Sequence, residues 1–337
     1  MIKTLIADDS ALAREIIRDF LEEDESFTVI GEAYDGEDAI SKILSLNPDL
    51  VTLDIEMPKK TGLEVIESVL KVTNIPIVVI SSHGSAKTAY EATLKGALEF
   101  YPKSIFSSDM DDEKKREIYD TLKRISGIKT RRENFPSFNN TIIESGKRKI
   151  NAVLIASSTG GPKALAVFFN LLPENFKVPI IIVQHNTSGF DESFVQWLDT
   201  YTILKVKLAE EGEAPAAGNV YIAHTDKHLE VKREGDRIFF HYNNSEPENN
   251  QKPAADVLFR TAAESYGDSL ISIVLTGMGH DGARGTKHVR DRGGITLAQD
   301  EESSLIYGMP KAARDTGCVD MVLPLEKIPQ ELLRLTQ

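Results

Sequence analysis

Short apolar runs rich in β-branched residues alternate with amphipathic stretches along the first 125 residues. The apolar runs are typical of buried strands, and the amphipathic stretches have the 3.6-residue period of helices. The pattern predicts strands at 3–7, 28–33, 50–53, 76–80 and 99–101, and helices at 12–21, 36–46, 62–70, 86–95 and 114–125. Strands and helices in this alternation indicate an α/β fold, a doubly wound five-stranded parallel sheet with helices on both faces.

The same alternation begins again after residue 150. It predicts strands at 151–156, 179–183, 270–275 and 294–299, and helices at 162–172, 255–264 and 282–292. Residues 219–242 differ, because three short apolar runs are separated there by polar turns, which is the pattern of an antiparallel hairpin. The second half is therefore predicted to be an α/β domain with a mostly parallel sheet and an antiparallel hairpin.

Length and composition support two domains. The chain has 337 residues, whereas a single core stops growing at roughly 250–300 residues. Residues 131–149 mix turn formers and charges without a sustained period, which is typical of a linker. We therefore predict domains at 1–125 and 150–337, joined by a linker at 126–149.

Charge and residue usage exclude several classes of protein. Apolar residues make up 41% of the chain, too many for a disordered protein. The single Cys318 cannot form an internal disulfide, the N-terminus does not resemble a secretory signal, and no apolar run approaches the ~18 residues of a membrane span. We expect a cytoplasmic protein without membrane insertion. The net charge of −13 disfavours nucleic-acid binding, which depends on Lys and Arg.

Carboxylates follow two of the predicted strands in the first domain. Asp8 and Asp9 come directly after the first strand and Asp54 after the third, while Ser81 and Lys103 follow the fourth and fifth. Parallel strands bring these ends to one edge of the sheet, where open α/β folds bind ligands. Carboxylates so close together repel one another unless a hard cation such as Mg²⁺ lies among them. The sequence therefore predicts a magnesium site.

This constellation resembles the receiver domain of bacterial response regulators over residues 1–125. The resemblance implies that Asp54 accepts a phosphoryl group from a histidine kinase. It also implies a set of Mg²⁺ ligands, namely Asp8 through water, Asp9, Asp54 and the backbone carbonyl of Glu56. Ser81 and Phe100 would be the switch pair that senses the phosphoryl group, and Lys103 would bind it. One departure is Ser104, which stands where a proline usually follows the lysine.

Three residues of the second domain suggest nucleophilic catalysis. Ser158, His185 and Asp281 each lie just beyond a predicted strand. Ser158 lies in a small-x-Ser-x-Gly pattern, which places a serine on a sharp strand-to-helix turn. Backbone amides at the start of the helix would face an oxyanion, His185 would take the serine proton, and Asp281 would orient the histidine.

Other interpretations of these residues stay open at this point. A Ser-Thr-Gly-Gly turn before a helix is also an ordinary N-cap or phosphate cradle, and a histidine at a strand end is often structural. Ser157 is a rival nucleophile because it is adjacent to Ser158. His224 and His228 have metal-ligand spacing only on a helix, and they lie in the predicted hairpin, so we reject a metal site there.

Residues 150–337 resemble the catalytic domain of the chemotaxis protein-glutamate methylesterases. The motifs that carry the resemblance are Ser157 to Gly161, Gln184-His185, Tyr221-Ile222-Ala223, Asp256 to Phe259, Leu275 to Gly279 with Asp281-Gly282, and Gly308-Met309-Pro310. The resemblance implies that Ser158 is the nucleophile, His185 the base and Asp281 the orienting acid, with Thr159 as a helper near the oxyanion and no cofactor for the esterase. The sequence departs from the family at Asn186-Thr187, at His280 and in the segment before Asp256.

The order of receiver, linker and esterase domain matches this family from end to end. The resemblance implies hydrolysis of glutamate methyl esters on the cytoplasmic helices of chemoreceptors, and deamidation of receptor glutamines at the same sites. The receiver would block the cleft at Ser158 until the chemotaxis histidine kinase phosphorylates Asp54. Two alternatives remain, a response regulator that binds DNA and a second domain that binds receptors without turnover.

Overall fold

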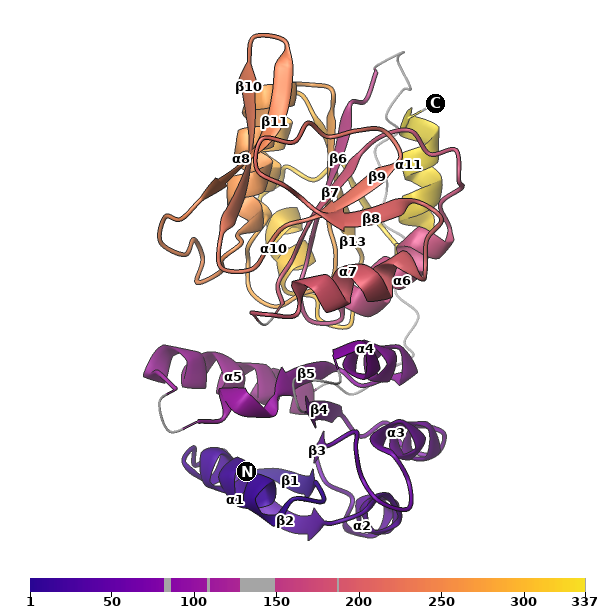
Figure 1. Ribbon diagram of the computed structural model, residues 1–337, viewed down its shortest axis with the longest axis vertical. Coiled ribbons are helices and arrows are strands. Elements are labelled where there is room, and N and C mark those ends of the chain that lie inside the picture. The colour runs from indigo at the N-terminus through magenta and orange to yellow at the C-terminus, as the bar shows by residue number, and fades with distance from the viewer. Residues whose placement is uncertain (82–85, 108–109, 128–148, 187, 337) are drawn as a thin grey trace. The chain divides into compact units, whose positions relative to one another are not determined.

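The computed structural model describes residues 1–81, 86–107, 110–127, 149–186 and 188–336 (Figure 1). The chain divides into two compact units, Met1–Asn134 and Phe135–Gln337. Apart from residues 126, 127 and 149, the predicted linker at 126–149 falls outside the described residues, so its bounds stay a prediction. None of the helices among the described residues is long and apolar enough to cross a membrane.

The first unit is the predicted five-stranded parallel sheet, in the order β2-β1-β3-β4-β5. Its elements are β1 (Ile2–Ala7), α1 (Ala11–Glu22), β2 (Phe27–Ala33), α2 (Gly36–Leu46), β3 (Leu50–Leu53), α3 (Gly62–Leu70), β4 (Ile77–Ser81), α4 (Ala86–Lys95), β5 (Glu99–Pro102), the 3₁₀ turn η2 (Lys103–Ile105) and α5 (Asp112–Ser126). Helices α1 and α5 cover one face of the sheet, and α2, α3 and α4 cover the other (Figure 1).

Side-chain caps explain where several of these helices begin. Ser10, Asp35, Thr61 and Asp111 each accept a hydrogen bond from a backbone N–H of the first helical turn. Such a cap stabilises a helix by about 1 kcal/mol, because it satisfies a donor that has no partner within the helix. Ser10 and Asp35 lie shortly after the carboxyl ends of β1 and β2, so two of the capped helices begin at that edge of the sheet.

The second unit contains a seven-stranded parallel sheet in the order β14-β13-β12-β6-β7-β9-β8 and a separate hairpin of β10 and β11. The strands are β6 (Ala152–Ser157), β7 (Ile180–Gln184), β8 (Lys205–Leu208), β9 (Asn219–Ile222), β10 (His228–Glu234), β11 (Arg237–Asn243), β12 (Leu270–Val274), β13 (Ile295–Gln299) and β14 (Met321–Leu323). The helices are α6 (Gly161–Asn170), α7 (Asp191–Asp199), α8 (Ala255–Tyr266), α9 (Ala283–Asp291), α10 (Met309–Asp315) and α11 (Ile328–Thr336), with the 3₁₀ turn η3 (Leu325–Lys327).

The predicted parallel sheet and hairpin are confirmed, with one correction. The whole of residues 219–242 has the pattern of an antiparallel hairpin, but β9 at its start pairs in parallel with β7 and β8 inside the main sheet. Within that segment, β10 and β11 alone form the antiparallel hairpin. The sequence around 219–222 shows a short apolar run, and this pattern does not reveal which neighbour the strand pairs with.

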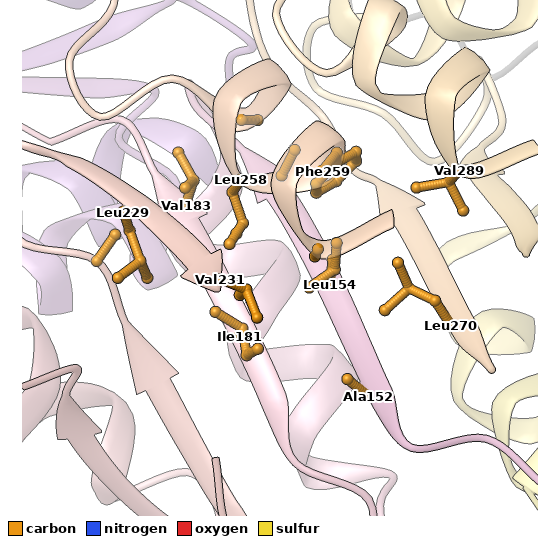
Figure 2. Close-up of a cluster of buried hydrophobic side chains, with 14 of the residues drawn as sticks. Ala152, Leu154, Ile181, Val183, Leu229, Val231, Leu258, Phe259, Leu270 and Val289 are labelled. Carbon is orange, nitrogen blue, oxygen red and sulfur yellow. The ribbon is translucent and has the colours of Figure 1, made fainter. Parts of the chain in front are cut away.

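A hydrophobic core joins the hairpin to the main sheet through α8 (Figure 2). Leu229 and Val231 of β10 pack with Leu258 of α8 and with Ile181 of β7, and all of these side chains are buried. Burying a side chain of this size contributes about 1.5–3 kcal/mol. This packing fixes the position of α8, whose N-terminus lies at the edge of the sheet that carries the candidate catalytic residues.

Candidate active site and phosphoacceptor site

The three predicted carboxylates of the first unit lie together. Carboxylate oxygens of Asp8, Asp9 and Asp54 are all within 4.8 Å of one another. Nζ of Lys103 is 2.8 Å from Oδ2 of Asp8 and 2.7 Å from Oδ2 of Asp54. Carboxylate oxygens are the ligands that Mg²⁺ prefers in proteins, so these three residues fit the ion.

The charges of this cluster perturb one another. Burial, together with the negative charge of Asp54, raises the pKa of Asp8 above its ordinary value, although Lys103 and the backbone N–H of Ser10 act in the opposite direction. Burial acts to lower the pKa of Lys103, but its hydrogen bonds to Asp54 and Asp8 outweigh burial and raise it. Lys103 alone therefore does not fully compensate for the negative charge of the carboxylates, and a cation among them would add the missing positive charge.

The predicted switch residues lie on the neighbouring strands. Ser81 ends β4 and is buried, and Phe100 lies in β5 with its ring centre 6.0 Å from that of Tyr90. Lys103 begins the 3₁₀ turn that follows β5, and Ser104 is the second residue of that turn. Glu56 lies in the turn after β3 with its side chain exposed.

The second unit brings Ser158 and His185 to the ends of adjacent strands. Ser157 of β6 is in register with Gln184 of β7, and the backbone N–H of His185 donates to the carbonyl of Ser157 at 3.0 Å. The residues that follow these two strands, Ser158 and His185, are therefore neighbours at the sheet edge. Asp281 follows β12, which pairs with β6 on the side opposite to β7.

Gln184 connects the two turns. Its Nε2 donates to the carbonyls of Ser158 and His185 at 3.1 and 3.0 Å, and its Oε1 accepts the Ser157 hydroxyl at 2.7 Å. Ser157 is fully buried, whereas Ser158 is only partly buried. The geometry thus favours Ser158 over Ser157 as a group that meets a substrate.

The turn after Ser158 leads directly into α6. Gly160 has φ +77°, and the backbone N–H of Gly161 donates to the carbonyl of Ser158 at 2.7 Å. Thr159 is buried, and its carbonyl accepts the Thr276 hydroxyl at 3.0 Å. This N–H of Gly161 is therefore already used, and the next residue of α6 is a proline without an N–H. An oxyanion at this turn would be stabilised by the other amides of the turn and by the positive partial charge at the start of α6.

His185 and Asp281 form a buried pair. Nε2 of His185 is 2.9 Å from Oδ2 of Asp281, and the two side chains are 7% and 2% exposed. Nδ1 of His185 is buried and has no hydrogen-bond partner within the part of the chain that the structure describes. Since Asp281 takes the N–H of Nε2, the lone pair is on Nδ1, which is then the nitrogen that can accept a proton.

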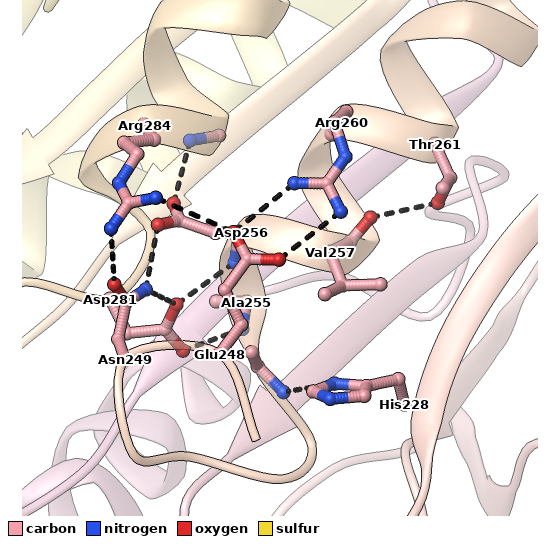
Figure 3. Close-up of polar contacts among 12 residues, drawn as sticks. His228, Glu248, Asn249, Ala255, Asp256, Val257, Arg260, Thr261, Asp281 and Arg284 are labelled. Atoms are coloured by element: carbon pink, nitrogen blue, oxygen red, sulfur yellow. Dashed lines mark hydrogen bonds and ion pairs between the residues drawn. The ribbon is translucent and has the colours of Figure 1, made fainter. Parts of the chain in front are cut away.

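Asp281 is held by several donors (Figure 3). Besides His185, they are the backbone N–H groups of Ala255, Asp256 and Gly282, at 2.6, 3.0 and 3.0 Å, and the amide of Asn249 at 3.0 Å. Burial alone would raise the pKa of Asp281, but the hydrogen bonds from His185 and the backbone outweigh it, and the pKa is lowered. The carboxylate therefore stays ionised beside the histidine.

Sequence reasoning missed three residues at this site. Gln184 and Asp256 were noted only within motifs, and Asn249 lies in a segment noted only for its departure from the family. Asp256 is fully buried beneath Asp281, and Asn249 contacts both carboxylates. No spacing rule identifies such contacts, because 32 residues separate Asn249 from Asp281 along the chain.

Gly161→Ala is expected to damage the second unit, since a Cβ at this position would lie 2.1 Å from Oε1 of Gln184 and 2.9 Å from Cβ of Ser157. Overpacking of this kind costs about 1–3 kcal/mol, and here it would displace Gln184 from the two turns. Denaturant unfolding should show the loss of stability. Gly127→Ala is the matched control, because the nearest atom to its Cβ would be 3.5 Å away. Equal stability of both variants would contradict the packing argument.

Fold and sites together define a two-domain regulatory protein, in which a receiver-type α/β domain precedes an α/β domain with a Ser-His-Asp constellation. Residues 4–113 match the family model of the response regulator receiver domain, and residues 153–332 match that of the CheB methylesterase. The chain belongs to the CheB methylesterase family and carries a receiver domain.

Similar proteins match the chain over its whole length. It is 39% identical to the protein-glutamate methylesterase/protein-glutamine glutaminase of Pyrococcus abyssi, with 100% of this chain and 94% of the relative covered. The Thermotoga maritima protein of the same name is 36% identical, with 99% and 98% covered. The crystal structure of the Thermotoga maritima CheB methylesterase catalytic domain is 43% identical and matches with a TM-score of 0.54, covering 56% of this chain and 99% of that domain.

Proposed function

We propose that this chain hydrolyses glutamate γ-methyl esters on the cytoplasmic helices of chemoreceptors and deamidates receptor glutamines at the same site. The observation that carries the proposal is the buried His185–Asp281 pair next to Ser158, in a chain whose full-length relatives are named for this activity. Neither a DNA-binding output nor a domain that only binds receptors is favoured by these relatives.

The proposed reaction is acyl transfer in two steps. The hydroxyl of Ser158 attacks the ester carbonyl while Nδ1 of His185 takes its proton. Backbone amides of the turn before α6, which contains Thr159, and the positive end of this helix stabilise the oxyanion. His185 returns the proton to the methoxy group, methanol leaves, and an acyl-enzyme ester remains on Ser158. Water then attacks this ester with His185 again as base, which restores Ser158 and releases glutamate. Asp281 holds the N–H of Nε2 and stabilises the imidazolium.

The receiver domain is proposed to control this activity. Asp54 accepts a phosphoryl group from the chemotaxis histidine kinase, and the phosphorylated state raises esterase activity. Lys103 moves from its ion pair with Asp54 to the phosphoryl oxygens, and Ser81 and Phe100 respond to the new group. Asp9, Asp54 and the backbone carbonyl of Glu56, with Asp8 through water, would hold Mg²⁺, and the ion would supply positive charge that compensates for the negative charge of the carboxylates and the phosphoryl group.

Mg²⁺ is expected to stabilise the first unit. At 100 times its dissociation constant, a ligand that binds only the folded state adds about 2.7 kcal/mol to the free energy of unfolding. Asp9→Asn should remove most of this gain at the same concentration, because it deletes an exposed ligand from the cluster. Urea unfolding with and without MgCl₂ measures the effect. Asp19→Asn, an exposed carboxylate on α1, is the control, and equal Mg²⁺ stabilisation in both variants would count against the ligand assignment.

The proposed function is tested by methanol release from methylated receptor membranes incubated with the full chain, with and without Mg²⁺ and a small-molecule phosphodonor. Ammonia release from receptors that carry glutamine at the methylation sites tests deamidation. We expect methanol release that rises with the phosphodonor. Receptor binding without any methanol release would overturn the proposal in favour of a binding module.

A further inference from the structure

Asn249 lies between two buried carboxylates at the edge of the esterase site (Figure 3). Its Nδ2 donates to Oδ2 of Asp256 at 2.8 Å and to Oδ1 of Asp281 at 3.0 Å. Its Oδ1 accepts a hydrogen bond from Nη2 of Arg284 at 2.9 Å. Both hydrogens of the amide are therefore used, one on each carboxylate, and the guanidinium fixes the orientation of the amide plane.

The two carboxylates need such a shared donor. Asp256 is fully buried and Asp281 is 2% exposed, so little water reaches either of them. Two negative charges at this depth repel strongly, and each requires hydrogen bonds to compensate for its lost hydration. Asp256 accepts only one other hydrogen bond from the described residues, from the backbone N–H of Gly285 at 2.6 Å.

The pKa values of the two carboxylates are shifted in opposite directions. Burial and the charge of Asp281 raise the pKa of Asp256, whereas the hydrogen bonds on Asp281 outweigh its burial and lower its pKa. The other charged groups that face the pair are His185 on Oδ2 of Asp281, Arg284 behind Asn249, and Glu248, whose partner is Arg260. Of the two carboxylates, the one that contacts His185 therefore has the more strongly stabilised ionised form.

We propose that Asn249 is a positioning residue of the esterase site: its amide holds Asp281 against Asp256, with Oδ2 turned toward His185. This inference rests on the proposed role of Asp281 as the orienting acid. Asn249 occupies one oxygen, Oδ1, and the backbone N–H of Ala255 fixes the other in place for the imidazole.

The backbone at position 249 makes asparagine a suitable residue. Its φ is +57°, in the left-handed region that asparagine, aspartate and glycine tolerate better than other residues. Aspartate would adopt the same backbone and nearly the same shape but has no hydrogens to donate. Asn249→Asp therefore replaces the donor with a third carboxylate, and Asn249→Gly removes the amide without backbone strain.

The neighbouring residue supplies a matched control. Asn250 has φ +59° and is exposed, so Asn250→Asp and Asn250→Gly make the same chemical changes one residue away from the carboxylates. We expect Asn249→Gly to lower kcat for methanol release about 10- to 100-fold with little change in KM, the effect of losing one hydrogen bond to a charged group. Asn249→Asp should lower kcat further, and the Asn250 variants should match the wild type.

A pH profile separates positioning from loss of structure. Both Asn249 variants should move the acidic limb of the kcat/KM profile to higher pH. Without the hydrogen bond from Asn249, the negative charge of Asp281 is compensated less and stabilises the imidazolium of His185 more strongly. Asn249→Asp should cause the larger shift. Arg284→Ala provides a variant whose folding is not in question, since this side chain is 66% exposed, and it should cause a smaller shift in the same direction.

Nuclear magnetic resonance of the His185 ring signals in the resting protein gives a readout that does not depend on turnover. The ring should titrate at higher pH in the Asn249 variants than in the wild type. If this shift occurs but the wild type releases no methanol, the proposed function fails and the positioning role stands. If methanol release depends on Ser158 while kcat, the pH profile and the ring titration all remain unchanged in Asn249→Asp, the positioning role is wrong.

Discussion

Ser158→Ala is expected to abolish nearly all methanol release from methylated receptors, with a loss of about 10⁴- to 10⁶-fold in kcat. Losses of this order follow removal of the nucleophile from a Ser-His-Asp site, because the acyl-enzyme cannot form and only binding and oxyanion stabilisation remain. Ser158 is partly buried in the turn between β6 and α6, so its replacement by alanine should leave the fold intact. The assay is methanol release by the full chain in the presence of Mg²⁺ and a phosphodonor.

Ser157→Ala is the informative comparison. The Ser157 hydroxyl is fully buried and donates to Gln184, so its removal leaves an acceptor without a partner and lowers stability by about 1–3 kcal/mol. It should retain far more activity than Ser158→Ala, because no substrate reaches a fully buried hydroxyl. Substantial methanol release by Ser158→Ala, or a complete loss confined to Ser157→Ala, would refute the assignment of the nucleophile.

The alternation of apolar runs and amphipathic stretches was sufficient to predict both sheets, because parallel strands are buried on both faces and their sequences are almost continuously apolar. The short edge strands escaped this pattern. β8 reads Lys-Val-Lys-Leu and β14 has only three residues, so neither has the length or the apolar content of a buried strand. The placement of β9 in the main sheet also depended on tertiary pairing that no local pattern encodes.

In the candidate sites, too, some residues could be predicted from the sequence and others could not. Asp54, Lys103, Ser158, His185 and Asp281 were predicted because each follows a strand, and strand ends meet at one edge of a parallel sheet. Asn249, Asp256 and Gln184 were not predicted, because their importance arises from contacts between segments that are distant in the sequence. The tautomer of His185 was equally inaccessible, since the choice of Nε2 as the partner of Asp281 depends on the ring orientation.

Asp54→Asn is expected to eliminate the response to phosphorylation. In the wild type, the phosphodonor should raise methanol release by about 5- to 150-fold, the range of a coupling free energy of ~1–3 kcal/mol. An amide cannot accept the phosphoryl group, so the variant should show no rise. The substituted side chain has nearly the shape of aspartate, and Lys103 keeps its ion pair with Asp8, so the first unit should remain folded.

The outcome separates two ways in which the receiver domain can act. Asp19→Asn, an exposed carboxylate on α1, should respond to the phosphodonor as the wild type does, which excludes a general effect of lost charge. A persistent rise in Asp54→Asn would mean that the phosphodonor acts elsewhere on the chain, and Asp54 would not be the phosphoacceptor. Loss of the rise together with retained Ser158-dependent release would instead locate the control of this esterase in one buried carboxylate of the receiver domain.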